Sequence, residues 1–134
     1  MSVLRPRLVI ADDEPLVRSM LWAQLERDFQ CLAVAVDADQ AITIARDLRP
    51  DIVLLDVNMP CGGARHATRA IRACSEHTTI VILSGDESDD DVVDLLNAGA
   101  TSYLRKGLDR ATLIAKMRAS IDAHRRWQAL ADSV

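Results

Sequence analysis

The stretch IVLLDVNMPCGG, residues 52–63, decides the fold of this chain. It opens with four apolar, uncharged residues, and such a short run is typical of a strand that is buried on both faces in a parallel sheet. The proline and the two glycines that follow break regular structure and indicate a loop. Asp56 is therefore predicted to lie at the carboxyl end of a central strand, where open α/β sheets bind their ligands.

Four further apolar runs resemble the first, and each of the five is followed by a segment with helical spacing of apolar residues. Because strands that alternate with helices form parallel sheets with right-handed crossovers, we predict an α/β fold: a doubly wound, five-stranded parallel sheet with helices on both faces. The predicted strands are residues 8–11, 32–36, 52–56, 79–83 and 101–104. The predicted helices run over about 16–29, from Asp37 or Asp39 to Arg49, over about 64–73, from the acidic run 86–91 to Gly99, and onward from Asp109 or Thr112.

Length and composition fit a single globular domain. The chain has 134 residues, of which 49% are hydrophobic and 27% charged, so we do not expect disorder. Sixteen basic and twenty acidic residues give a net charge of −4 without the basic patch that direct nucleic-acid binding requires. No apolar run approaches the roughly eighteen residues of a membrane span. Cys31, Cys61 and Cys74 lack metal-ligand spacing and are typical of free thiols in a reducing cytoplasm, where we expect the protein.

Polar residues stand at the ends of four predicted strands, in positions that a parallel sheet brings to one edge. Asp12 and Asp13 follow the first strand, Asp56 ends the third, Ser84 follows the fourth and Lys106 follows the fifth. Any one of them alone would be an ordinary helix-start acid, turn residue or surface lysine. Their coincidence at one edge favours a functional site.

These residue types point to phosphoryl chemistry. Three carboxylates brought together repel one another, and hard oxygen ligands of this kind suit Mg²⁺ or Mn²⁺. An ionised Asp56 could attack phosphorus as a nucleophile. The ammonium of Lys106 and the hydroxyl of Ser84 would neutralise charge on the phosphoryl oxygens, while Gly85 leaves room beside them.

At these positions the chain resembles the receiver domain of two-component response regulators, over about residues 6–122. That family has an acidic pair after the first strand, a phosphoacceptor Asp after the third, Ser or Thr after the fourth and Lys after the fifth. The matching residues are Asp12, Asp13, Asp56, Ser84 and Lys106, with Met59, Pro60 and Gly63 in the loop behind the phosphoacceptor.

The resemblance implies a flavodoxin-like (βα)5 fold and a phosphorylation-activated signalling switch. It implies that Mg²⁺ is bound by Asp13, Asp56 and the backbone carbonyl of Asn58, with Asp12 acting through water. It also implies that Asp56 takes phosphate from a sensor histidine kinase or a histidine phosphotransfer protein. In the family, an aromatic residue on the fifth strand, here Tyr103, swings inward when the hydroxyl of the Ser or Thr moves to the phosphoryl group. Ser84 and Tyr103 would then change partner binding or homodimer formation through the face around the fourth helix, fifth strand and fifth helix.

One position departs from the usual family pattern. Many receivers have Pro after the lysine, whereas this chain has Gly107. Receivers joined to helix-turn-helix DNA-binding outputs often lack that Pro, and residues 99–107 resemble this subfamily. Gly107 therefore weakly favours the subfamily joined to helix-turn-helix outputs, and it does not change the predicted phosphoacceptor site.

The last predicted helix is longer than a receiver requires. We assign residues 1–122 to the receiver domain and residues 123–134 to an extension of this helix. Within the extension, residues 123–126 are polar enough to be expected to face solvent. Trp127 and the apolar residues at i+3, i+4 and i+7 from it, up to Val134, form a second stripe. We interpret the stripe as part of a connector helix that packs against a dimer partner, a following output domain or the receiver's own surface, the alternative being a frayed tail with an incidental Trp.

Two other functions remain open. An Mg²⁺-dependent phosphatase with an aspartyl-phosphate intermediate would need an acid two residues after the nucleophile, and Asn58 occupies that place. An interaction module that keeps the fold for docking would not need the complete set of five site residues. We therefore predict a phosphoacceptor switch and not an enzyme.

Overall fold

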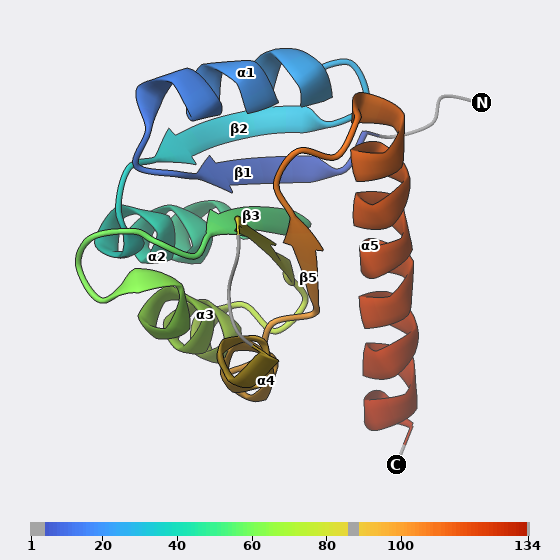
Figure 1. Ribbon diagram of the computed structural model, residues 1–134. Helices are drawn as coiled ribbons and strands as arrows, with labels where there is room; N and C mark the ends of the chain where they lie inside the picture. Colours follow the sequence, from blue (N-terminus) through green and yellow to red (C-terminus); the bar gives the residue numbers. More distant parts are fainter. Residues whose placement is uncertain (1–4, 86–88, 134) are drawn as a thin grey trace.

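The computed structural model describes residues 5–85 and 89–133, and it contains one parallel sheet with helices on both faces (Figure 1). The strand order is β2-β1-β3-β4-β5, with every neighbouring pair parallel. This confirms the predicted doubly wound fold. The strands are β1 Arg7–Ala11, β2 Gln30–Ala35, β3 Ile52–Asp56, β4 Thr79–Ser84 and β5 Ser102–Arg105.

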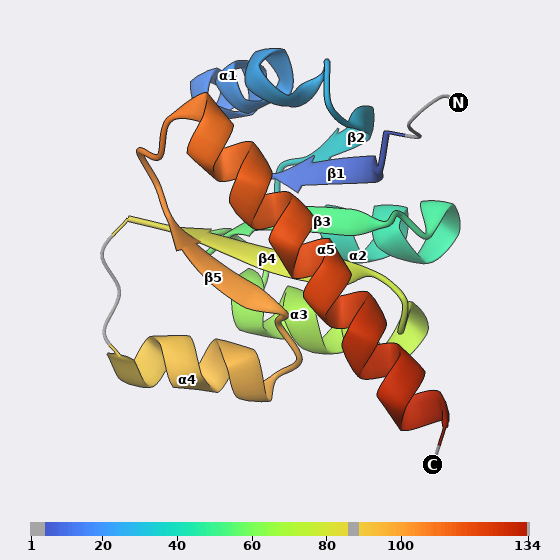
Figure 2. The same ribbon diagram turned by 90° about the vertical axis from the view of Figure 1, so that its right-hand side faces the viewer.

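Two helices cover one face of the sheet and three cover the other (Figures 1 and 2). α1 and α5 pack on the first face around Leu25 and Met117, and α2, α3 and α4 pack on the second around Ala41 and Ile71. The central strand β3 is buried along its whole length, as the apolar run at residues 52–55 predicts. The helices are α1 Pro15–Leu25, α2 Ala38–Leu48, α3 Gly63–Cys74, α4 Asp89–Asn97 and α5 Arg110–Asp132.

Local sequence signals determine where these helices begin. Pro15 occupies the first turn of α1, where a missing N–H costs little. Of the two candidate caps for α2, Asp37 is the one used, and its carboxylate accepts a hydrogen bond from the backbone N–H of Gln40 at 2.8 Å. Asp109 opens α5 in the same way, with its carboxylate 2.8 Å from the backbone nitrogen of Thr112.

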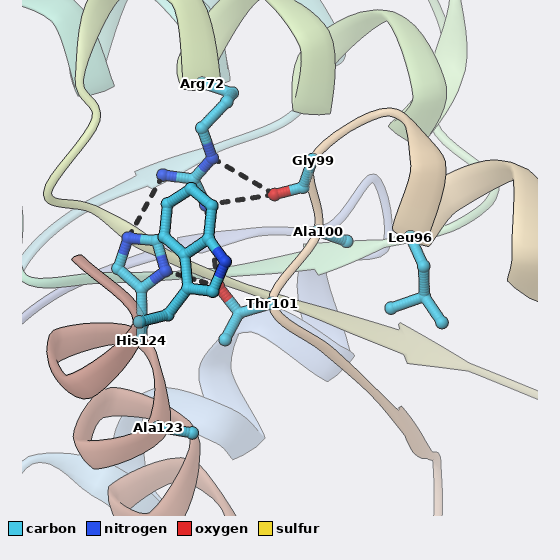
Figure 3. A pocket seen from close by; sticks show the side chains of 8 residues that line it. Arg72, Leu96, Gly99, Ala100, Thr101, Ala123 and His124 are labelled. Carbon is cyan, nitrogen blue, oxygen red and sulfur yellow. Dashed lines mark hydrogen bonds between the residues drawn. The ribbon is translucent and has the colours of Figure 1, made fainter. Parts of the chain in front are cut away.

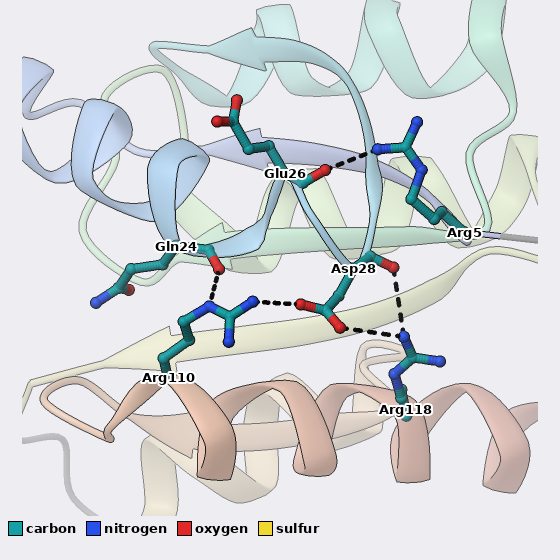
Figure 4. Close-up of polar contacts among 6 residues, drawn as sticks. All are labelled: Arg5, Gln24, Glu26, Asp28, Arg110 and Arg118. Atoms are coloured by element: carbon teal, nitrogen blue, oxygen red, sulfur yellow. Dashed lines mark hydrogen bonds and ion pairs between the residues drawn. The ribbon is translucent and has the colours of Figure 1, made fainter.

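A cluster of charged side chains joins the end of α1 to α5 (Figure 4). The carboxylate of Asp28 pairs with the guanidinium groups of Arg110 and Arg118. Arg110 also donates through Nε to the backbone carbonyl of Gln24 at 2.8 Å, and Arg118 lies 5.8 Å from the ring centroid of Phe29. The two helices on this face are thus tied together by polar contacts as well as by the apolar core.

The structure corrects two details of the sequence analysis. α1 ends at Leu25 rather than near Phe29. His124 lies in the segment expected to face solvent but is only 6% exposed, because it packs against residues from other elements. Residues 86–88 of the acidic run and Val134 lie outside the described residues.

Within the described ranges, no helix combines the length and the apolar character that crossing a bilayer demands.

Candidate functional site

Three carboxylates meet at the carboxyl edge of the sheet. Asp12 and Asp13 follow β1, and Asp56 ends β3, which is the neighbour of β1 in the sheet. One oxygen from each residue lies within 4.8 Å of the others. Asp12 and Asp56 are buried, at 1% and 4% exposure, whereas Asp13 is exposed. The site is therefore an anionic cluster that is open to solvent on one side only.

Lys106 lies against this cluster from the end of β5. Its Nζ is 2.8 Å from Oδ1 of Asp56 and 3.7 Å from Oδ2 of Asp12, and a third of its side chain is exposed. Burial by itself lowers the pKa of Lys106, but the hydrogen bond to Asp56 and the charges of Asp56 and Asp12 outweigh it and raise the pKa above its usual 10.5. The ammonium is therefore charged throughout the physiological pH range and offsets part of the carboxylate repulsion.

The environment of Asp12 fits a hard cation. Burial raises the pKa of Asp12 above its usual value, and although the Glu14 backbone N–H lowers it and the Lys106 charge opposes it, the charges of Asp56 and Asp13 add to the rise. Within the described residues, Oδ2 of Asp12 has no hydrogen-bond partner although it is buried. A buried anionic oxygen of this kind, beside two further carboxylates, is the donor set that Mg²⁺ or Mn²⁺ prefers.

The other oxygen of Asp12 belongs to a feature that the sequence analysis missed. Oδ1 accepts a hydrogen bond from the backbone N–H of Glu14 at 2.9 Å, and the carbonyl of Asp12 accepts one from Arg18 at 2.8 Å. Asp side chains at turns commonly accept a hydrogen bond from the backbone N–H two residues further on. The turn sequence from Asp12 to Pro15 could therefore have predicted this bond. These bonds fix the orientation of the Asp12 carboxylate.

Ser84 stands between the acidic cluster and β5. Its hydroxyl is fully buried, and no hydrogen-bond partner for it is found in the ranges that the structure describes. The backbone N–H of Lys106 donates to the Ser84 carbonyl at 2.7 Å, which keeps the two residues together. A Cβ built on Gly85 would meet no atom of the described residues within 4 Å. A buried hydroxyl without a partner costs free energy unless a ligand satisfies it.

The loop after Asp56 is shaped by positive backbone angles. Cys61, Gly62 and Gly63 all have positive φ, at 64°, 100° and 70°. A Cβ at Gly62 would lie 2.9 Å from Cβ of His66, so this position needs glycine for space as well as conformation. Asn58 is exposed in this loop, and Tyr103 is half-buried on β5, packed against the core beneath α2, α3 and α4. The roles of Asn58 and Tyr103 stay predictions.

Comparison with known proteins places the chain in a family. Residues 8–118 match the family model for the response regulator receiver domain. The DNA-binding response regulator MtrA of Mycolicibacterium smegmatis is 36% identical over 121 residues, which cover 90% of this chain and 53% of that protein. The transcriptional regulatory protein PrrA of Mycobacterium tuberculosis is 36% identical over 122 residues, covering 88% of this chain and 51% of that protein. The chain thus spans about half the length of the curated relatives it matches.

Solved structures agree with this placement. A LuxR-family two-component response regulator from Aurantimonas sp. SI85-9A1 superposes with a TM-score of 0.81 at 31% identity, covering 87% of this chain and 85% of the other. The receiver domain of the putative response regulator NarL from Mycobacterium tuberculosis gives a TM-score of 0.82 at 25% identity, covering 92% and 98%. In sequence and in fold, the chain belongs to the response regulator receiver domains of two-component signalling.

Proposed function

We propose that Asp56 accepts a phosphoryl group from a phosphohistidine of a sensor kinase or phosphotransfer protein in the cytoplasm. The observation that carries this proposal is the contact of Lys106 Nζ with Asp56, 2.8 Å away, beside the buried hydroxyl of Ser84, which has no hydrogen-bond partner among the described residues. A nucleophilic carboxylate, a fixed cation and a hydroxyl donor around one open position are what phosphoryl transfer to a carboxylate needs. The domain is thus a phosphoacceptor and not a turnover catalyst.

In the transfer, one oxygen of Asp56 attacks the phosphorus atom of the donor. The new P–O bond forms as the P–N bond to the donor imidazole breaks, and the imidazole leaves with its electron pair. Lys106 then shifts from the Asp56 oxygen to a phosphoryl oxygen, and the Ser84 hydroxyl donates to another. Positioning and charge neutralisation supply most of the catalysis in reactions of this class.

The acidic cluster supports Mg²⁺ as the cofactor, with Mn²⁺ as a substitute. Asp12, Asp13 and Asp56 would hold it with their carboxylates, and Asn58 with its backbone carbonyl. When bound, the ion supplies Lewis-acid neutralisation of the phosphoryl oxygens and lowers the repulsion among the three carboxylates. Asp13 is the exposed member of the set, so it offers a ligand without disturbing the buried pair.

Mg²⁺ should stabilise the wild-type domain. At about a hundred times its dissociation constant, a ligand that binds only the folded state raises the free energy of unfolding by about 2.7 kcal/mol. Asp13→Asn removes a ligand at an exposed position, so this variant should fold but lose most of the Mg²⁺-dependent rise in melting temperature. Thermal unfolding with and without Mg²⁺ measures both. Asp47→Asn, an exposed carboxylate on α2, is the control, and an equal loss in it would refute the assignment.

The phosphoryl group is proposed to act through Ser84 and Tyr103. Movement of the Ser84 hydroxyl toward the phosphoryl oxygen would free space for Tyr103 to swing inward, and so bias a two-state equilibrium of the face formed by α4, β5 and α5. That face would bind an output domain in cis, an effector in trans or a second copy of the domain. The names of MtrA and PrrA, a DNA-binding response regulator and a transcriptional regulatory protein, favour an output on DNA for a longer chain of this kind.

Ser84→Ala tests this role. Because the hydroxyl is buried and unpaired among the described residues, removing it should leave the unphosphorylated domain as stable as the wild type, or up to about 1 kcal/mol more stable. The stabilisation gained on phosphorylation should instead shrink by about 1.5–3 kcal/mol, the usual worth of a hydrogen bond to a charged group. Chemical unfolding with and without acetyl phosphate measures both, and Ser84→Thr, which keeps the hydroxyl, should behave like the wild type.

The direct test of the proposal is a labelling experiment. The protein is incubated with Mg²⁺ and acetyl phosphate, and intact mass and elution volume are followed together. The expected result is a mass increase of one phosphoryl group, which should not appear when Mg²⁺ is chelated before the incubation. Absence of any adduct from acetyl phosphate and from a phosphorylated histidine donor would instead leave a docking module with the receiver fold.

A further inference from the structure

His124 is the last buried residue of α5 within the described residues. It sits where α5 meets two connections, the segment between α3 and β4 and the segment between α4 and β5 (Figure 3). The ring Nε2 is 2.8 Å from the carbonyl oxygen of Glu76, and Nδ1 is 3.5 Å from Oγ1 of Thr101. Arg72 of α3 completes the group, with Nη1 3.3 Å from Nε2.

The contacts of the ring define its tautomer. A carbonyl oxygen can only accept, so Nε2 must carry a hydrogen and donate it to Glu76. Nδ1 then carries no hydrogen, and its lone pair faces the hydroxyl of Thr101. That hydroxyl already accepts from the backbone N–H of Ile80 at 3.1 Å and from Nη2 of Arg72 at 3.5 Å, so its own hydrogen is left to donate to Nδ1. Only the neutral ring satisfies this arrangement.

The guanidinium of Arg72 is held in place by its own hydrogen bonds and cannot move away from a charged His124 ring. Its Nη1 donates to the carbonyls of Glu76 and Thr78, both at 2.8 Å, and its Nε and Nη2 donate to the carbonyl of Gly99 at 3.1 and 3.0 Å. Figure 3 shows Arg72 spanning from Gly99 to His124. Arg72 is therefore a fixed positive charge beside the ring.

A second proton on His124 would break the arrangement in two ways. It would place an N–H at Nδ1 against a hydroxyl oxygen that already accepts two hydrogen bonds, and a positive charge 3.3 Å from the guanidinium of Arg72. Burial lowers the pKa of His124 below its usual 6.5; the bond to Glu76 opposes this, and the charges of Arg72 and His77 lower it further. The charged or titratable groups that act on the ring are Arg72 on α3 and Glu76 and His77 between α3 and β4. Asp122, Arg125 and Arg126 are its neighbours along α5, and residues 98–101 between α4 and β5 carry no charged side chain.

Beyond His124, α5 has few contacts with the rest of the domain. Gln128 donates to the same Glu76 carbonyl at 2.9 Å, and the indole of Trp127 stacks on the His124 ring with centroids 6.1 Å apart. Trp127 is 63% exposed and Leu130 69% exposed. A cavity of about 500 Å³ borders the ring between α5 and Leu96 of α4, so water can reach a ring that leaves its place. The contact of Trp127 is made with the His124 ring, and the contact of Gln128 is made with the Glu76 carbonyl that His124 also binds.

We propose that His124 is a pH-sensitive latch: its neutral ring holds residues 125–133 of α5 against the domain, and its protonation releases them. The ring binds protons more weakly in the folded domain than in the unfolded chain. The contribution of the latch to stability is therefore complete above about pH 6.5 and is lost as the pH falls through the lower pKa of the folded state. The latch works without phosphate or metal.

Nuclear magnetic resonance of the full 134-residue chain tests the latch in a single titration. The ring proton signals of His124 give its pKa, which should lie below the usual 6.5. Backbone order parameters of residues 125–133 should be about 0.85 at pH 7.5 and fall below about 0.6 with the same midpoint as His124. His124→Gln, which can still donate to the Glu76 carbonyl, should keep these residues ordered over the whole range.

Two variants separate the latch from general acid sensitivity. His124→Lys places a permanent charge beside Arg72, so residues 125–133 should be mobile at pH 7.5 while the signals of the sheet stay native. His77→Gln, an equivalent change at an exposed histidine, should leave the transition in place. The proposal is overturned if residues 125–133 stay ordered when His124 is protonated, if they melt at the same pH in His124→Gln, or if His124 stays neutral until the whole domain unfolds.

Discussion

Asp56→Asn should abolish the proposed acyl-phosphate adduct. The amide nitrogen and oxygen of asparagine are poor nucleophiles toward phosphorus. Among the described residues of this edge, Asp56 is the carboxylate that lies within hydrogen-bond distance of Lys106, at 2.8 Å, whereas Asp12 lies 3.7 Å from it. The variant should fold, because asparagine has nearly the same shape and its loss of charge relieves repulsion with Asp12 and Asp13. Intact mass after incubation with acetyl phosphate and Mg²⁺ should show no phosphoryl adduct.

The control for this prediction is a carboxylate outside the cluster. Asp47→Asn on α2 should label as fast as the wild type, because its side chain lies on the exposed surface of that helix. Unfolding curves for Asp56→Asn without Mg²⁺ show whether the domain is intact. A folded Asp56→Asn that labels fully would move the phosphoacceptor to another residue and refute the proposed function.

Lys106→Ala has the second largest expected effect. Lys106 is the cation that the structure places against Asp56 and Asp12, and its loss leaves the developing charge on the phosphoryl oxygens without that counterion. Removing one preorganised charge-stabilising donor typically slows a reaction by about 10²- to 10³-fold, and we expect the same for the labelling rate. Lys116→Ala, an exposed lysine on α5, should leave the rate unchanged.

The same variant should bind Mg²⁺ more tightly. Lys106 and the metal ion are both cations that neutralise the same carboxylates, so removing one favours the other. A unit charge at this distance supports a change of about tenfold or more in the dissociation constant. Titration calorimetry with Mg²⁺ measures it. Opposite changes in the two quantities, slower labelling with tighter metal binding, would distinguish an electrostatic role from misfolding, whereas weaker metal binding would contradict it.

Much of the site could be predicted because the order of strands and helices alone shows which residues meet at one edge of the sheet. Once the apolar runs establish a parallel sheet, its strands end at one edge, and Asp12, Asp56 and Lys106 must converge there whatever their neighbours are. The contact of Lys106 with both carboxylates follows from that topology. The lack of a partner for the Ser84 hydroxyl within residues 5–85 and 89–133 does not follow from it, because strand order alone does not determine the surroundings of one buried side chain.

The burial of His124 was not predicted from the sequence. Its neighbours Arg125 and Arg126 made the segment look polar, yet Met117, Ile121 and His124 continue one helical face at intervals of four and three residues. That spacing could have identified the ring as buried. Its partners could not have been predicted, because Glu76, Thr101 and Arg72 come from three separate elements whose relative positions only the folded structure defines.

The length of α5 gives the domain a mechanical property. Its 23 residues make a rod of about 34 Å at 1.5 Å per residue. The helix packs on the domain from Leu113 to His124, and the residues beyond His124 are mostly exposed. Any change in the angle at which α5 packs on the sheet would therefore cause its largest displacement at this exposed end.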